Sequence, residues 1–218
     1  MLGSADLESP VRRGALTAVV VLGGLAIHLA VQRSAPPPLL RLDGGLVAMT
    51  PFLPWTVWIY LLFFPLLVAT GALISPERWI RLVGAWGVAS ITTWVLVLLV
   101  PVTFARPALS ALGDSAHGWV LGVVYGIDPA HVTFPCLHAA VIWIAWLALA
   151  RADRRLRVAF LVLALAITVS TMTTRQHLVT DNVAGLAIAW FSARLLLPGL
   201  RETRAAAVTR AETASPET

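Results

Sequence analysis

Six long apolar segments divide this chain and restrict it to one class of fold. Most of them reach the roughly 17–25 residues that a helix needs to cross the hydrocarbon core of a bilayer. With 58% hydrophobic and 12% charged residues, the chain is too apolar for a soluble domain of 218 residues. The segments are Ala15–Val31, Phe52–Ile74, Trp79–Phe104, Leu137–Ala150, Leu156–Thr174 and Leu178–Leu197. The sequence therefore predicts an all-α polytopic membrane protein with six transmembrane helices in a bundle.

All 16 basic residues are arginines, and their distribution predicts the orientation of the bundle. With the N-terminus inside, 12 arginines lie on the inner side and 4 on the outer side. Positive charge favours the cytoplasmic side, so we expect a multi-pass cell-membrane protein with both termini in the cytoplasm. Topology thus explains the net charge of +5, and we expect no nucleic-acid partner. The absence of lysine fits a GC-rich bacterial genome.

The termini and one loop differ in composition from the apolar segments. Residues 1–14 are expected to form a disordered cytoplasmic N-terminus, residues 15–198 the membrane domain, and residues 201–218 a disordered cytoplasmic tail. The longest outer loop runs from Arg106 to Thr133. It is predicted to hold a short helix on the membrane surface, with Trp119 and Tyr125 as interfacial anchors.

His177 and Asp181 are the most informative polar pair, because both lie at the outer edge of the sixth segment. On a helix this spacing places the two side chains on one face, about one turn apart. The carboxylate can then orient the imidazole and stabilise its charged form. The alternatives are a histidine that only holds two spans together, or a metal ligand. Zinc ligation is disfavoured because neither a third ligand nor a paired histidine at helical spacing is present.

The predicted topology brings further polar residues to the same outer face. His138 begins the fourth segment, so one histidine can attack phosphorus while the other protonates the departing oxygen. Arg106 and Arg175 are the arginines closest to these histidines, and their guanidinium groups suit phosphate oxygens. Snorkelling at the interface is the structural alternative for both arginines.

Other candidates are weaker. Cys136 is expected to be a small buried residue and His28 a packing or hydrogen-bonding residue of the first span. His117 and His131 are expected to be ordinary loop histidines, although either could lie at the mouth of the site. Asp128 is expected to order the loop.

These residues resemble three motifs of the type 2 phosphatidic acid phosphatase superfamily. Arg106-Pro107 is similar to the end of the first motif, Lys-x6-Arg-Pro, but Leu99 replaces its lysine. The second motif, Pro-Ser-Gly-His, is matched by Pro135 and His138, with Cys136 in place of serine. The third, Ser-Arg-x5-His-x3-Asp, is matched at its serine, histidine and aspartate: Ser170, His177 and Asp181, with Thr171 in place of arginine.

The departures are similar to one branch of that superfamily, which holds the inositol phosphorylceramide synthases and sphingomyelin synthase-like proteins. A basic residue two positions before the histidine is usual there, and Arg175 fills that place. A pocket without the lysine and the arginine is less cationic, which suits a phosphodiester with one negative charge.

The resemblance implies a mechanism that needs no metal and no cofactor. His177 attacks phosphorus and forms a phosphohistidine. Asp181 orients the His177 imidazole, and His138 protonates the leaving group. Arg106 and Arg175 bind the phosphate oxygens. The substrate is a lipid phosphate or phospholipid, and the acceptor decides between lipid phosphatase and phosphotransferase.

Two other functions remain open. One is a catalytically inactive lipid-binding or scaffold protein of the same fold. The other is a small transporter with a proton relay, which is disfavoured because the sequence has no internal repeat. The oligomeric state is not predicted.

Overall fold

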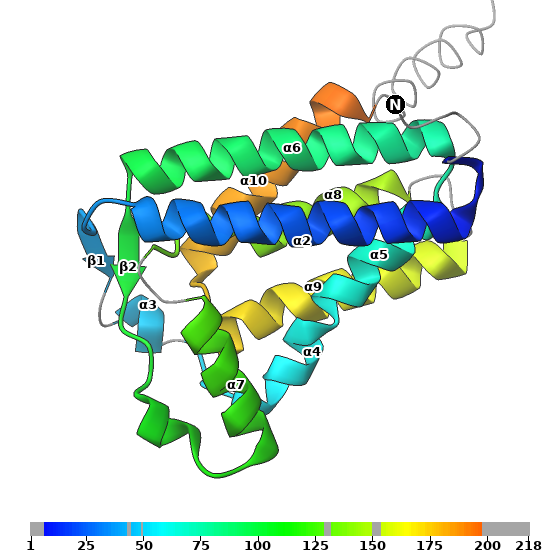
Figure 1. Cartoon of the computed structure of the whole chain (residues 1–218). Helices are drawn as coiled ribbons and strands as arrows, with labels where there is room; N and C mark the ends of the chain where they lie inside the picture. The colour runs from blue at the N-terminus through cyan, green and yellow to red at the C-terminus, as the bar shows by residue number, and fades with distance from the viewer. Residues whose placement is uncertain (1–6, 43–44, 49, 129–131, 150–153, 198–218) are drawn as a thin grey trace, which may run out of the picture.

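The computed structural model describes residues 7–42, 45–48, 50–128, 132–149 and 154–197, and these are mostly helical. The elements in chain order are α2 (Pro10–Ser34), β1 (Leu40–Leu42), α3 (Gly45–Ala48), η1 (Pro54–Thr56), α4 (Val57–Leu61), α5 (Phe63–Leu73), α6 (Pro76–Leu99), β2 (Val102–Phe104), η2 (Leu109–Leu112), α7 (Ala116–Ile127), α8 (Leu137–Ala148), α9 (Arg154–Thr173) and α10 (Val179–Leu196). Figure 1 shows α2 and α6 side by side, with the two strands at one end of the bundle.

Among the described residues, four helical stretches are long and apolar enough to cross a membrane. They are Pro10–Ser34, Pro54–Leu73, Pro76–Leu99 and Arg154–Thr173. α8 is apolar but has only 12 residues, and the first turns of α10 contain Thr180, Asp181 and Asn182. The prediction of a helical membrane protein is therefore confirmed, whereas the count of six spans is not established by helix length.

Prolines and their neighbours set two of the helix boundaries. α2 begins at Pro10, four residues before the predicted end of the disordered N-terminus, because the Ser9 hydroxyl accepts a hydrogen bond from the Arg12 amide at 3.4 Å. Residues 1–6 and 198–218, which include the predicted disordered tail, lie outside the described part. In the second segment, α4 ends at Leu61 because the ring of Pro65 clashes with a helical carbonyl four residues earlier.

A pair of short parallel strands was not predicted, and the third predicted segment ends earlier than expected. α6 ends at Leu99 because Pro101 cannot continue the helix, and residues 102–104 become extended. β2 pairs with β1 in the register Leu40–Val102, and the Leu39 amide donates to the Pro101 carbonyl at 2.8 Å. The strands therefore tie the connection after α2 to the end of α6.

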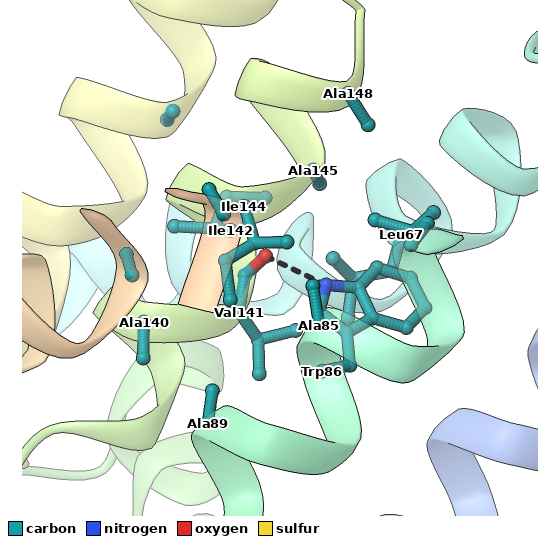
Figure 2. Packing of buried hydrophobic residues seen from close by; sticks show 14 of the residues in the cluster. Leu67, Ala85, Trp86, Ala89, Ala140, Val141, Ile142, Ile144, Ala145 and Ala148 are labelled. Carbon is teal, nitrogen blue, oxygen red and sulfur yellow. Dashed lines mark hydrogen bonds between the residues drawn. The ribbon is translucent and has the colours of Figure 1, made fainter. Parts of the chain in front are cut away.

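α8 is the centre of the bundle and packs against α5, α6, α9 and α10. It is apolar on all sides, as expected for a helix that is enclosed by others. Figure 2 shows Val141 and Ile142 of α8 facing Ala85 and Trp86 of α6. The Trp86 indole N–H donates to the Val141 carbonyl at 3.0 Å, so this buried donor has a partner.

The predicted outer-loop helix is present as α7, which packs against η1, η2 and α4. Trp119 is 72% exposed, which fits its predicted role as an interfacial anchor. Tyr125 does not fit that role, because it is buried and its hydroxyl donates to the Thr174 carbonyl at 2.7 Å. α7 therefore covers the end of α9 from which His177 follows.

Candidate active site

Two buried histidines meet where α8 begins and α10 is about to begin. His138 is the second residue of α8, and His177 lies in the short connection between α9 and α10. The His138 Nδ1 atom is 3.2 Å from the His177 Nε2 atom, and the two rings are tilted by 61°. The predicted pairing of these residues, 39 positions apart in the sequence, is therefore present in the structure.

Two oxygen atoms lie near the other nitrogen of His177. Its Nδ1 atom is 2.8 Å from the Thr133 carbonyl oxygen and 3.7 Å from an Asp181 carboxylate oxygen. The first distance is a hydrogen bond, while the second is too long for one but close enough for charge to act. Nδ1 therefore carries the proton that the carbonyl accepts, and Nε2 is the nitrogen that faces His138.

The helical explanation for the pairing of His177 and Asp181 was wrong. α10 begins at Val179 with Leu178 as its N-cap residue, so His177 precedes the helix and does not share a face with Asp181. The Asp181 carboxylate instead accepts the Leu178 amide at 2.8 Å, as acidic residues in a first helical turn commonly do. That hydrogen bond turns the chain so that His177 lies beside the carboxylate.

Arg175 has a left-handed backbone, with a φ angle of 56°, and ends α9. The Gln176 amide donates to the Thr171 carbonyl at 2.9 Å, and the Arg175 amide donates to the Met172 carbonyl at 3.0 Å. This is the Schellman arrangement, in which glycine is the usual left-handed residue. The turn projects His177 back toward α8, and its amide also donates to the Thr171 carbonyl at 3.0 Å.

Gly185 permits the close approach of α10 and α8 that aligns the two histidine-bearing segments. A Cβ atom at Gly185 would lie 2.4 Å from the Cys136 carbonyl oxygen and 3.1 Å from the Ala139 Cβ. The Cys136 amide donates to the Asp181 carbonyl at 3.0 Å, directly across this contact. The absence of a side chain at Gly185 is thus a condition for the geometry of the site.

Tyr60 is a member of the site that sequence reasoning missed. It lies in α4, and its hydroxyl oxygen is 2.9 Å from the His138 Nε2 atom. The signal was present in the sequence, because Tyr60 and Tyr125 are the only tyrosines. Both are buried and both form hydrogen bonds at this end of the bundle.

Arg106 reaches the site through Gln176. Its guanidinium donates to the Asp128 carbonyl at 2.5 Å and to the Gln176 side-chain oxygen at 2.7 Å, and it lies 4.8 Å from the centre of the Tyr125 ring. Among the described residues, two buried donors next to these contacts have no partner: Arg106 Nε and Gln176 Nε2. An unpaired buried donor costs about 1–3 kcal/mol, so this place favours a ligand that accepts hydrogen bonds.

The Arg175 side chain binds backbone carbonyls of another segment. Its guanidinium donates to the carbonyl of Val47 and, at 2.6 Å, to that of Thr50. Both acceptors belong to the segment between β1 and η1. Arg175 therefore holds this segment against the end of α9.

Burial of His177 lowers its pKa, but Cys136 and the Asp181 carboxylate outweigh burial and raise the pKa to about 10. The histidine pair therefore retains one extra proton near neutral pH. His177 Nε2 and His138 Nδ1 face each other at 3.2 Å, so a proton on either nitrogen can be donated to the other.

An apolar cavity of about 310 Å³ opens beside His138, between α2, α5, α6 and α8. Phe63, Trp86 and Trp94 are among its lining residues. His28 also lines it, and its buried Nδ1 atom has no hydrogen-bond partner among the described residues. His28 was predicted to be a packing or hydrogen-bonding residue, and its Nδ1 atom remains available to a molecule in the cavity.

The remaining candidates lie outside the histidine pair or outside the described residues. His117 is half-buried in α7, and Asp128 is buried with its carbonyl bound to Arg106. His131 is not among the described residues. Within the described ranges, Cys136, His138 and His177 form a group able to hold a metal ion, because their donor atoms all lie within 4.8 Å of one another.

Comparison with known proteins gives one match. The family model described as the PAP2 superfamily matches residues 79–204, which is more than half of the chain. No curated protein and no solved structure matches the chain.

Proposed function

The chain belongs to the PAP2 superfamily, and we propose that it is a lipid phosphatase or phosphotransferase that forms a phosphohistidine at His177. The observation that carries this proposal is the 3.2 Å contact between His138 Nδ1 and His177 Nε2. It supplies a nucleophile and a proton donor within reach of one phosphorus atom.

His177 Nε2 is the proposed nucleophile. The shared proton first moves from Nε2 to His138 Nδ1, which leaves His177 neutral and His138 charged. Nε2 then attacks phosphorus, the bond from phosphorus to the leaving oxygen breaks, and His138 delivers the proton to that oxygen. The Thr133 carbonyl and the Asp181 carboxylate, at 2.8 Å and 3.7 Å from Nδ1, stabilise the positive phosphohistidine.

The second half of the reaction reverses these proton transfers. Neutral His138 takes a proton from water or from an alcohol, whose oxygen attacks the phosphohistidine and releases His177. Tyr60 keeps the His138 ring in place during both steps, because its hydroxyl contacts the ring nitrogen that does not face the substrate. Tyr60 is therefore a positioning residue.

The substrate must separate the two rings. In-line attack needs the nucleophile about 3 Å from phosphorus, and the leaving oxygen needs a further hydrogen bond to His138. The 3.2 Å separation of the nitrogens is too short for both. The phosphate therefore enters between the histidines and replaces their mutual hydrogen bond.

Phosphate oxygens are proposed to bind Arg106 and the Gln176 amide, since each has a buried donor without a partner among the described residues. Arg175 can join them only if its guanidinium gives up a carbonyl of the segment before η1. The lipid chain is proposed to occupy the apolar cavity beside His138, with His28 facing the polar end of the substrate.

The finer assignment is to the branch that transfers phosphorylated headgroups. Thr171, in the place of the third-motif arginine, shares a hydrogen bond with Asn182 and offers no charge. Leu99, in the place of the first-motif lysine, is 66% exposed. A pocket in which Arg106 is the main cation suits a singly charged phosphodiester, the group through which a phosphorylated headgroup is attached to a lipid.

We further propose six spans with both termini in the cytoplasm and the site at the outer face. The 12-to-4 distribution of arginines supports this orientation. The orientation is tested by labelling single cysteines in the Cys136→Ser background. They are introduced at Ser115 in the outer loop and at Arg204 in the tail. Labelling of position 115 from the cytoplasmic side would contradict the orientation.

The function is tested by turnover of purified protein in detergent with EDTA. The substrates are phosphatidic acid, a polyprenyl pyrophosphate, and phosphatidylinositol with ceramide or diacylglycerol as acceptor. We expect turnover and an acid-labile phosphate on the protein, both absent in His177→Ala and retained in His117→Ala, the matched control. Folded protein that turns over no substrate and binds lipid equally well with and without His177 would instead indicate the non-catalytic alternative.

A further inference from the structure

Cys136, His138 and His177 bring one sulfur and two nitrogen donors together in a buried position, with all three atoms within 4.8 Å of one another. We infer that these side chains form an inhibitory binding site for a divalent ion of the zinc class. The site is distinct in chemistry from the proposed reaction, which uses the histidines without a metal.

The donor types and distances suit a tetrahedral ion. Thiolate sulfur and imidazole nitrogen are the ligands that zinc prefers, at about 2.3 Å and 2.0–2.1 Å. Tetrahedral bonds of these lengths place two nitrogens about 3.3 Å apart, and His138 Nδ1 and His177 Nε2 are separated by 3.2 Å. Tetrahedral bonds place the sulfur about 3.5 Å from each nitrogen. The donor atoms lie within 4.8 Å of one another, so the sulfur needs to approach by no more than about 1.3 Å, which rotations of the three side chains can supply.

Groups behind the ligands are already arranged as metal sites require. The Thr133 carbonyl and the Asp181 carboxylate lie 2.8 Å and 3.7 Å from the distal nitrogen of His177. The Tyr60 hydroxyl lies 2.9 Å from the distal nitrogen of His138. Such partners orient ligating imidazoles and raise their basicity.

The charge of the ion would also be balanced. Binding displaces two protons to solvent, one from the Cys136 thiol and one from the facing nitrogens of the histidine pair. The resulting thiolate and the Asp181 carboxylate together offset two positive charges. An ion without such compensation would be strongly disfavoured in a buried position. The fourth coordination position remains for water.

Cys136 makes this site a property of this chain, because the second motif it resembles has serine at that position. A neutral hydroxyl is a much weaker zinc ligand than a thiolate. A bound ion occupies both His177 Nε2 and His138 Nδ1, so metal and phosphate exclude one another. Metal binding does not depend on the proposed function, whereas inhibition does.

Binding is tested first by titrating chelator-treated full-length protein with Co²⁺ and then with Zn²⁺. We expect one Co²⁺ per chain, a thiolate-to-cobalt charge-transfer band, and its loss when Zn²⁺ replaces Co²⁺. Cys136→Ser should lose the band and bind the ion more weakly by at least about tenfold. His117→Ala, which removes another histidine outside the site, should bind as the wild-type chain does.

Inhibition is measured separately, as the ratio of turnover with and without Zn²⁺ for each variant. Wild type should be inhibited reversibly by Zn²⁺ and restored by EDTA, whereas Cys136→Ser should need at least about ten times more Zn²⁺. If Cys136→Ser does not fold, His138→Gln is used for the Co²⁺ titration and should also lose tight binding. Absence of the charge-transfer band in wild type, or equal binding by Cys136→Ser, would overturn the site even if the protein proves inactive as an enzyme.

Discussion

Replacing Gly185 by alanine would disturb the active site without removing any group that takes part in the reaction. The new Cβ would lie 2.4 Å from the Cys136 carbonyl oxygen, whereas ordinary contacts begin at 3.4 Å. α10 must therefore move away from α8 by about 1 Å, because a backbone carbonyl at a helix start cannot rotate aside. Cys136 and Asp181 are joined across this contact, so His138 and His177 would separate with it.

Gly185→Ala is expected to change the reaction rate far more than the stability. In an unconstrained helix, glycine to alanine stabilises by about 1 kcal/mol, whereas overpacking destabilises by about 1–3 kcal/mol. A displacement of about 1 Å between reacting groups lowers the rate by about 100-fold. We therefore expect Gly185→Ala to lower kcat/KM by about two orders of magnitude while the thermal midpoint falls only modestly.

The assay is kcat/KM on the best substrate of the panel, with thermal unfolding of the same detergent preparation. Gly23→Ala is the matched control, since a Cβ at Gly23 of α2 meets nothing within 4 Å. It should keep its activity and unfold at the same or a slightly higher temperature. Gly185→Ala with wild-type activity and an unchanged or raised midpoint would refute the claim that this approach positions the histidines.

Three further changes test other parts of the site. Tyr60→Phe removes the hydroxyl that contacts His138 at 2.9 Å. We expect about a fivefold lower kcat with little change in KM, because one hydrogen bond contributes about 1 kcal/mol. A rise in KM as large as the fall in kcat would contradict a positioning role. Arg175→Gly and Arg175→Ala both lose the hydrogen bonds to Val47 and Thr50, but only glycine tolerates the φ of 56° without strain. The glycine variant should therefore be more stable than the alanine variant by about 1 kcal/mol in thermal unfolding. The reverse order would refute the left-handed turn. Because the pKa of His177 is raised to about 10, above an unfolded value of about 6.5, its protonation stabilises the folded protein fully below about pH 6.5 and this contribution is lost as the pH rises toward 10. The proposed mechanism needs the same proton, so kcat/KM should also fall as the pH rises. Asp181→Asn should move both the loss of stability and the fall in kcat/KM to lower pH, as measured by pH-dependent unfolding and kinetics.

The sequence predicted those parts of the fold that depend on one segment at a time. Apolar length located the helices, and the distribution of arginines suggested that His138 and His177 share one end of the bundle. Their contact at 3.2 Å agrees with that suggestion. Pro65 also signalled the break before α5, because proline acts on the backbone of its own helix.

Features that depend on two distant segments were not predictable in this way. The strands β1 and β2 pair three residues each from positions about 60 apart, and neither has enough length to be recognised alone. Tyr60 was hidden in an apolar segment, and its role depends on the packing of α4 near α8. The interpretation of Arg175 used its distance along the chain from His177, but its left-handed backbone sends the side chain elsewhere.

The shortness of α8 has a consequence for the choice of acceptor. Twelve residues span about 18 Å, whereas the hydrocarbon core is about 30 Å thick. In the orientation proposed above, α8 is too short to reach both boundaries, so the start of the helix at His138 would lie up to about 12 Å below the outer boundary. At that depth bulk water is scarce, and an alcohol carried on a lipid arrives from within the bilayer. Helix length alone would then favour transfer between lipids over hydrolysis.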